Sequence, residues 1–113
     1  MKSSRSAVLA GALSVASVLA VSGLANAQPS GKLSDMGFIA AARCTGLAEG
    51  SHADAAALRA VLAREENRHP PYALDRADEM RSEAKGQAAR ATGYAKQSIA
   101  DELAGPCQSY LKG

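Results

Sequence analysis

The side chains best suited to chemistry in this 113-residue chain are its two cysteines, Cys44 and Cys107. They stand 63 positions apart, and neither belongs to a Cys-x-x-Cys or Cys-x-x-Cys-His motif. The redox and haem-attachment patterns are therefore both absent, and we expect the pair to form a structural disulfide. A nucleophilic Cys44 assisted by His52 or His69 is the alternative, but no sequence signature supports it.

The two histidines give no metal-binding pattern. Neither His52 nor His69 has a second ligand three or four residues further along the chain, and a zinc site would need two more donors from elsewhere. Glu65 and Glu66 could place carboxylates near His69, but glutamates at the end of an exposed helix are common. We predict no metal site and expect both histidines to be exposed in loops.

Arg43 stands in the middle of an apolar stripe, four residues after Ile39 and four before Leu47. We consider three interpretations, in order of preference. The aliphatic stem lies along the core while the guanidinium reaches water. Alternatively, a carboxylate such as Glu102 or Asp101 holds a partly buried guanidinium next to the cysteines. In the third interpretation, Arg43 contacts an anion or a partner at a groove.

Motifs for catalysis are absent from the sequence. It contains no Gly-x-Gly-x-x-Gly or P-loop phosphate motif, no Gly-x-Ser-x-Gly elbow and no His-Glu-x-x-His pair. No acid, base and nucleophile stand together in a recognisable constellation. We predict no catalytic residue, no cofactor and a protein that is not an enzyme.

The first 27 residues have the pattern of a secretory signal peptide. Lys2 and Arg5 precede an uncharged, mostly apolar run, and small residues at Ala25 and Ala27 form a cleavage site. An uncleaved membrane anchor is the alternative, but an apolar run of about 18 residues barely spans a bilayer. We therefore predict a signal peptide at 1–27, a flexible lead at 28–33 and a helical domain at 34–113. The protein is expected in the periplasm or secreted, with no membrane segment after cleavage.

Cleavage would also change the charge balance. The chain has 13 Lys and Arg against 11 Asp and Glu, and both Lys2 and Arg5 leave with the signal peptide. Basic and acidic side chains are then equal in number. A nucleic-acid interface needs clustered basic residues on one face, so we predict no nucleic-acid partner. An unknown protein partner is compatible with the sequence, and the oligomeric state stays open.

Export also explains why the cysteines should pair. Disulfides persist in oxidising compartments and are frequent in small exported domains. The part of the chain after the cleavage site is rich in alanine and poor in bulky apolar side chains. Closing the loop between the cysteines would contribute about 4 kcal/mol on the chain-entropy model, which a thin core of this size needs.

Only helices are predicted along the domain, which makes it an all-α bundle of three or four helices. We expect helices at 34–48, with Ser34 or Asp35 as cap, and at 53–68, capped by Ser51. A long helix should begin near Tyr72, break near Gly93 and resume to 103. Gly105 and Pro106 then stop the last helix, and a short tail follows. The long helix should present an alanine-lined seam: Ala73, Ala77, Met80, Ala84, Ala88, Ala91, Ala95 and Ile99.

The first helix should bury one face. Met36, Ile39, Ala40, Cys44 and Leu47 form its apolar stripe, whereas Phe38 stands on the opposite side. The glycines at positions 46 and 50 are expected to weaken the end of this helix.

The order of motifs resembles a known group of proteins. The segment from Arg43 to Leu47, the acidic pair Asp101-Glu102 and the terminal Cys107 are similar to those of uncharacterised small exported all-helical proteobacterial proteins with one cysteine pair. This resemblance implies a periplasmic or secreted helical domain with one disulfide, and no activity. A weaker similarity is to the acid-stress periplasmic chaperones, which are also small, helical and held by one disulfide, although their cysteine span is shorter.

Three functional classes follow from the sequence. The first is a non-catalytic helical module that has a binding or structural role in the cell envelope. The second is an acid- or stress-responsive holdase chaperone that exposes apolar surface when its carboxylates are protonated. The third is an inhibitor or immunity-type partner of another exported protein.

Overall fold

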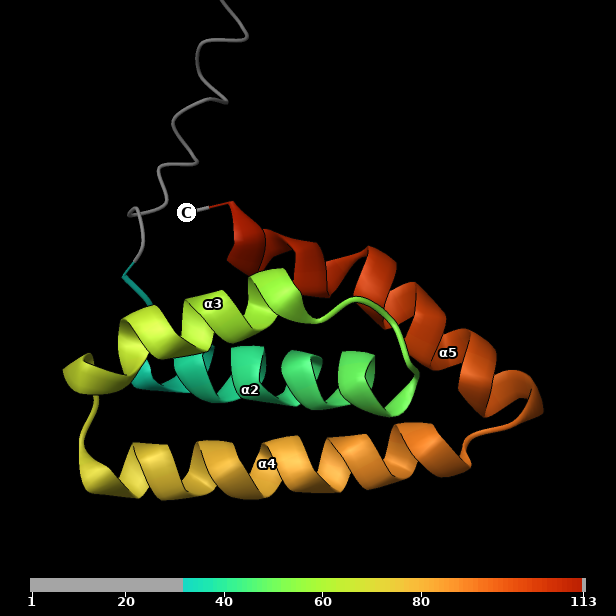
Figure 1. The fold of residues 1–113 in the computed structure, drawn as a ribbon, viewed down its shortest axis with the longest axis horizontal. Helices are drawn as coiled ribbons and strands as arrows, with labels where there is room; N and C mark the ends of the chain where they lie inside the picture. The colour runs from blue at the N-terminus through green and yellow to red at the C-terminus, as the bar shows by residue number, and fades with distance from the viewer. Residues whose placement is uncertain (1–31, 113) are drawn as a thin grey trace, which may run out of the picture. The chain divides into compact units, whose positions relative to one another are not determined.

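The computed structural model describes residues 32–112, and in this part of the chain every regular element is helical (Figure 1). The signal peptide expected at 1–27 and most of the expected lead lie outside the described residues. The elements, in chain order, are α2 (Asp35–Gly50), α3 (Ala56–Glu65), η2 (Glu66–Arg68), α4 (Pro71–Arg90), α5 (Gly93–Ala104) and η3 (Pro106–Leu111). The prediction of an all-α bundle with four helices is confirmed.

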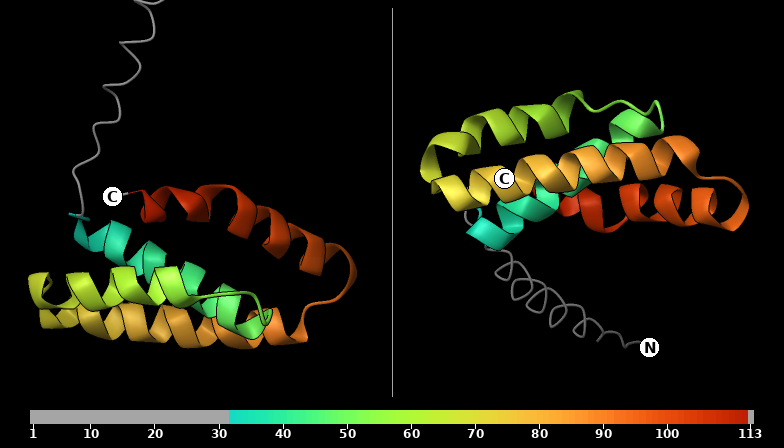
Figure 2. Two further views of the ribbon diagram at one scale, coloured as in Figure 1. Left: turned by 45° about the horizontal axis from the view of Figure 1, so that its top comes forward. Right: turned by 90° about the horizontal axis from the view of Figure 1, so that it is seen from below.

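Helix α2 lies at the centre of the domain. It contacts α3 and α4 on one side and α5 with η3 on the other (Figure 2). Nearly every residue from 38 to 50 is therefore buried or half-buried, and the helix is apolar almost all round. The one-sided stripe predicted from the sequence is wrong in two places, because Phe38 is buried whereas Met36 is 72% exposed.

The start of α2 follows the sequence signals. Ser34 is extended, and its hydroxyl oxygen accepts a hydrogen bond from the Gly37 N–H at 2.9 Å. This bond satisfies one of the free amides of the first turn. Asp35 adds a negative charge at the positive end of the helix dipole. The predicted cap at Ser34 is confirmed.

The contact between α2 and α4 is close because glycine and alanine meet there. A Cβ atom added at Gly46 would overlap the carbonyl of Arg81, and one added at Gly50 would overlap the carbonyl of Lys85. Ala84 and Ala88 of α4 face these two glycines. The predicted alanine seam is therefore real in this part of α4. The expectation that the glycines only weaken α2 is wrong, because they let the two backbones approach.

Helix α3 begins later than predicted. The Asp54 side chain, and not Ser51, accepts a hydrogen bond from the Ala56 N–H at 2.9 Å, so the helix begins at Ala56. At its other end the α-helix stops at Glu65 and continues as one 3-10 turn to Arg68. Both termini of the predicted element at 53–68 needed this correction.

The break between α4 and α5 occurs where the sequence indicated it. Ala91 and Thr92 are extended, and Gly93 has a φ of +56°, which glycine adopts without a steric penalty. The chain then turns back over α2, and Ile99 of α5 is buried against it, whereas Ala95 is exposed. After Gly105 the expected tail is ordered as η3, which brings the C-terminal segment to α2.

No helix in the described range 32–112 is long and apolar enough to cross a membrane.

Candidate functional site

The disulfide joins the centre of α2 to η3. Cys44 and Cys107 are bonded, with their Cα atoms 5.8 Å apart, and both side chains are buried. They pack in one apolar cluster with Ala48, Ala55 and Leu58. The predicted disulfide is confirmed, and it ties the last element to the helix that every other α-helix contacts.

An ion pair stands beside the disulfide. Nε of Arg43 donates a hydrogen bond to Oε2 of Glu102, and Nη2 donates one to Oε1, both at 3.0 Å. This bidentate contact raises the pKa of Arg43. The structure bears out the second interpretation, a guanidinium held by Glu102 beside the cysteines. A role of Arg43 in contacting an anion or a partner stays a prediction, because nothing in the structure tests it.

Removing this ion pair has a modest expected effect. Arg43→Met leaves the Glu102 carboxylate without its partner, although that side chain is 30% exposed and solvent screens it. We expect a loss of about 0.5–1.5 kcal/mol in the free energy of unfolding, measured by urea denaturation. Arg76→Met is the matched control, since Arg76 makes an exposed pair with Glu79. Equal losses in the two variants would contradict a special role for Arg43.

Glu49 links three helices through charge. Its carboxylate accepts two hydrogen bonds from Arg81 of α4, at 2.7 and 3.0 Å, and one from Arg59 of α3 at 2.9 Å. The Glu49 side chain is only 10% exposed. The hydrogen bonds from Arg81, followed by the one from Arg59, lower the pKa of Glu49 from 4.5 to about 2.

The Glu49 contacts predict how stability depends on pH. Because its folded pKa is below its unfolded value, the stabilisation is fully present above about pH 4.5 and is lost as the pH falls through about 2. We expect Glu49→Gln to remove about 1–3 kcal/mol at neutral pH, allowing for solvent around the arginines. The variant should lose less further stability than the wild type between about pH 5 and pH 2. Urea denaturation across this range measures both effects.

The control for this prediction is Glu83→Gln. Glu83 is exposed on α4, so its substitution should change stability by less than about 0.5 kcal/mol. If Glu49→Gln left the acid dependence of unfolding the same as in the wild type, the proposed role of the Glu49 carboxylate would be wrong.

A second polar cluster, which was not predicted from the sequence, holds the start of α2 against α3 and α4. His69 is only 3% exposed in its side chain, and its Nδ1 lies 2.6 Å from a carboxylate oxygen of Asp35. Its Nε2 lies 3.1 Å from Glu65, and its ring stacks on Phe38 with the centroids 4.4 Å apart. The expectation of an exposed loop histidine is therefore wrong for His69, whereas His52 is exposed as predicted.

Glu65 also departs from its expected exposed position. Its side chain is fully buried, and Oε1 accepts a hydrogen bond from the Leu33 N–H at 3.3 Å in addition to the His69 contact. Tyr72 donates a hydrogen bond to Asp35 at 2.9 Å, and the bonds from His69 and Tyr72 lower the pKa of Asp35. The cluster joins the segment before α2 to α3 and α4. The four-residue spacing of Glu65 and His69 was the one sequence signal for it.

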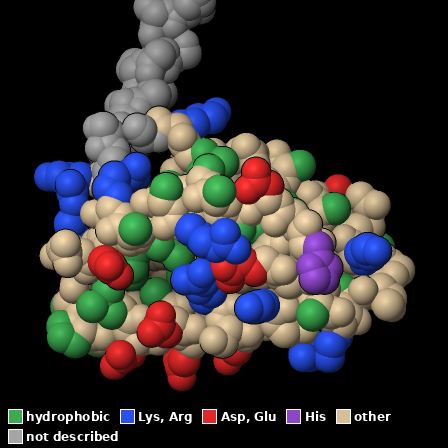
Figure 3. Space-filling model, in the orientation of Figure 1, with side chains coloured by type: hydrophobic (Ala, Val, Ile, Leu, Met, Phe, Trp, Pro, Cys, Tyr) green, Lys and Arg blue, Asp and Glu red, His purple; other side chains and the backbone are tan. Residues whose placement is uncertain are grey.

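Surface charge is mixed on the face that Figure 3 draws. Basic and acidic side chains meet near its centre, and acidic side chains line its lower edge over α4. This arrangement gives no continuous basic stripe on the visible face.

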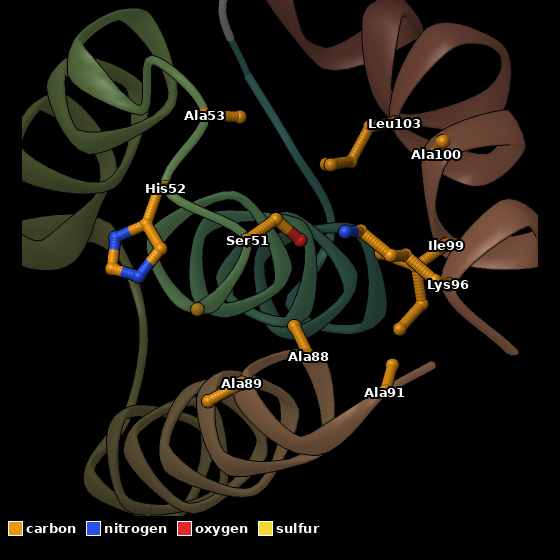
Figure 4. A pocket seen from close by; sticks show the side chains of 11 residues that line it. Ser51, His52, Ala53, Ala88, Ala89, Ala91, Lys96, Ile99, Ala100 and Leu103 are labelled. Carbon is orange, nitrogen blue, oxygen red and sulfur yellow. The ribbon is translucent and has the colours of Figure 1, made fainter. Parts of the chain in front are cut away.

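A cavity of 340 Å³ lies where the end of α2 faces the end of α4 and the middle of α5. We call it the α2–α5 pocket. Its apolar wall comes chiefly from Ala88, Ala91, Ile99 and Leu103 (Figure 4). Its volume is within the range of about 300–1,000 Å³ that small-molecule sites occupy. Two other cavities among residues 32–112 fall in the same range, at 420 and 390 Å³, and we take the α2–α5 pocket as the candidate functional site because it combines an aliphatic wall with Ser51 and Lys96.

Three polar side chains accompany this apolar wall. Ser51, His52 and Lys96 line the α2–α5 pocket, and in Figure 4 Ser51 and Lys96 extend toward each other across it. His52 has a φ of +61°, the left-handed conformation that a helix terminus usually gives to glycine. The sequence could not predict this assembly, because it depends on the direction that α5 takes after the break at Gly93.

The two cysteines and Glu102 also form a group with metal-ligand spacing. Their ligand atoms lie within 4.8 Å of one another. The sulfur atoms of Cys44 and Cys107 are bonded to each other, so neither is the thiolate that a metal ion would need. The two cysteines form a disulfide, and Glu102 belongs to the ion pair with Arg43 beside it.

The chain matches no protein-family model, and comparison with curated proteins and with solved structures also finds no match.

Proposed function

We propose that the protein is an exported, non-catalytic helical module that binds a ligand in the cell envelope. The observation that carries the proposal is the α2–α5 pocket, a cavity of 340 Å³ with an aliphatic wall and a polar side, which three helices form together. The disulfide between Cys44 and Cys107 supports the export part of the proposal, because such bonds persist in oxidising compartments. The signal pattern at 1–27 supports it independently.

A purely structural role in the envelope is the nearest alternative. A binding module and a purely structural module differ in whether the pocket holds a ligand. Ala53 lines the pocket, and Figure 4 shows its Cβ directed into it. Ala57 is exposed on α3 and does not line the pocket. Ala53→Phe should therefore fill the cavity, whereas Ala57→Phe is a control for adding the same side chain elsewhere.

The experiment is native mass spectrometry of the protein purified from the envelope fraction. We expect the wild type and Ala57→Phe to carry a bound small molecule, and Ala53→Phe to have lost it. Circular dichroism checks that both variants fold. Recovery of the wild type in the cytoplasm with free thiols would contradict export. An empty wild-type pocket, or a ligand that Ala53→Phe retains, would contradict the binding role.

The acid-responsive holdase is disfavoured by one observation. Such a chaperone must open when its carboxylates are protonated. The pKa of Glu49 is lowered to about 2, so the contacts that join α2, α3 and α4 persist well below pH 4. Protection of a client from aggregation between about pH 3 and pH 4 would restore the holdase. A single saturable protein partner in the envelope would instead favour the inhibitor class.

A further inference from the structure

We infer that the α2–α5 pocket takes a small amphiphilic anion, an aliphatic chain that carries one carboxylate. This inference rests on the proposed binding function and names its ligand class. The chain would lie against the apolar wall, and the carboxylate would face Lys96 and Ser51 at the opening. Three features of the pocket lead to this class of ligand.

The first feature is the shape and chemistry of the wall. Ala88 and Ala91 of the α4 end face Ile99 and Leu103 of α5 across the cavity (Figure 4). These side chains are aliphatic, and the imidazole of His52 is the one aromatic ring among the described residues that line the pocket. An unbranched hydrocarbon chain buries its surface here without leaving a polar group unpaired.

The second feature is the charge of the pocket. Among the described residues that line it, Lys96 is the one Lys, Arg, Asp or Glu, and Ser51 supplies a hydroxyl beside it. The backbone amides of the adjoining turn are already used, because Ser51 N–H donates to Leu47 and His52 N–H to Glu49. An ammonium group can only donate, so the part of a ligand that faces Lys96 should accept hydrogen bonds, and a carboxylate also brings the opposite charge.

The third feature is the conformation of His52. A non-glycine residue in the left-handed region is strained, and glycine would adopt the same backbone without that cost. Strained residues that persist in a fold gather at functional sites. His52 borders the pocket and is exposed, and in Figure 4 its imidazole points away from Ser51 and Lys96, so the backbone of this residue and not its ring belongs to the head-group end of the pocket.

The strain gives a separate test of stability. His52→Gly should raise the urea midpoint of unfolding, because the backbone conformation is retained and the penalty disappears. Because the imidazole points away from Ser51 and Lys96, the same variant should bind the carboxylate as tightly as the wild type does. An unchanged or lower urea midpoint would contradict the strain at His52.

The main experiment compares three probes of equal chain length by calorimetric titration of the oxidised protein. The probes are octanoate, 1-octanol and octylammonium. We expect octanoate to bind with one-to-one stoichiometry, about fivefold or more tightly than octanol, and octylammonium to bind most weakly. Lys96→Gln should weaken octanoate about three- to tenfold and leave octanol unchanged. Lys85→Gln is the control, since Lys85 is exposed on α4 and does not line the pocket.

The outcomes separate this inference from the proposed function. If all three probes bind with equal affinity and Ala53→Phe blocks them, the pocket binds ligands but the anionic class is wrong. The same conclusion follows if Lys96→Gln leaves octanoate binding unchanged. If no probe binds, or if Ala53→Phe has no effect on binding, the inferred ligand class is wrong and these titrations give the binding role no support. The native mass spectrum of the envelope protein then decides that role by itself.

Discussion

Replacing Cys44 and Cys107 together by alanine is expected to lower the free energy of unfolding by about 4 kcal/mol. The disulfide closes a loop with a sequence separation of 63, so the unfolded chain without it has far more conformations. Domains of this size have roughly 5–15 kcal/mol of stability in total. The variant should therefore melt far below the oxidised wild type, and a large fraction should be unfolded at 37 °C.

Chemical reduction is the matched comparison for this prediction. Reduced wild type and the double alanine variant should have similar melting temperatures, measured by circular dichroism in the same buffer. Reduction of the double variant should change nothing. An oxidised wild type whose melting temperature does not respond to reduction would contradict the stabilising role of the disulfide.

Gly46→Ala is the second substitution with a large expected effect. Whether it raises or lowers the free energy of unfolding depends on how closely α2 and α4 approach each other. In an exposed helix interior, exchanging glycine for alanine stabilises by about 1 kcal/mol. At Gly46 the added Cβ would overlap the Arg81 carbonyl and press on the Ala84 Cβ, so α2 and α4 must move apart. We expect a net loss of about 1–3 kcal/mol, measured by urea denaturation.

Gly86→Ala is the control for this substitution. Gly86 lies inside α4, and an added Cβ there would meet only the flexible end of the Arg90 side chain. This variant should gain about 0.5–1 kcal/mol. If Gly46→Ala stabilised the protein as Gly86→Ala does, the close approach of α2 and α4 would be wrong.

The features that local sequence signals encode were predictable. Ser34 was recognised as a cap from its residue type, and the break near Gly93 from a glycine inside a helical pattern. The disulfide followed from the presence of only two cysteines, and Glu102 was one of two carboxylates considered as the partner of Arg43. Each of these inferences needed only a short segment or a single pairing.

The features that depend on packing between distant elements were missed. Gly46 looked like a weak point in α2 until α4 was placed against it. Glu65 and His69 looked like exposed ends of a helix, yet the start of α2 covers them. Phe38 stands on the side opposite the predicted apolar stripe, and the sequence does not show that α2 is surrounded on nearly all sides, so that this side is buried as well.

The α2–α5 pocket belongs to the same class of missed features. Its residues come from three segments, and none of these segments has a recognisable binding motif. His52 was read only as a loop histidine, because its left-handed backbone cannot be seen in the sequence. The pocket arises when α5 turns back over α2, which the extended residues before Gly93 make possible.

Mass spectrometry of the exported, non-reduced protein tests at once whether the chain is processed and whether its cysteines are bonded. We expect a chain that begins at Gln28, after cleavage at Ala27, and that lacks the two hydrogen atoms lost when Cys44 and Cys107 form their bond. A full-length mass with both thiols free would contradict an exported domain held together by its disulfide.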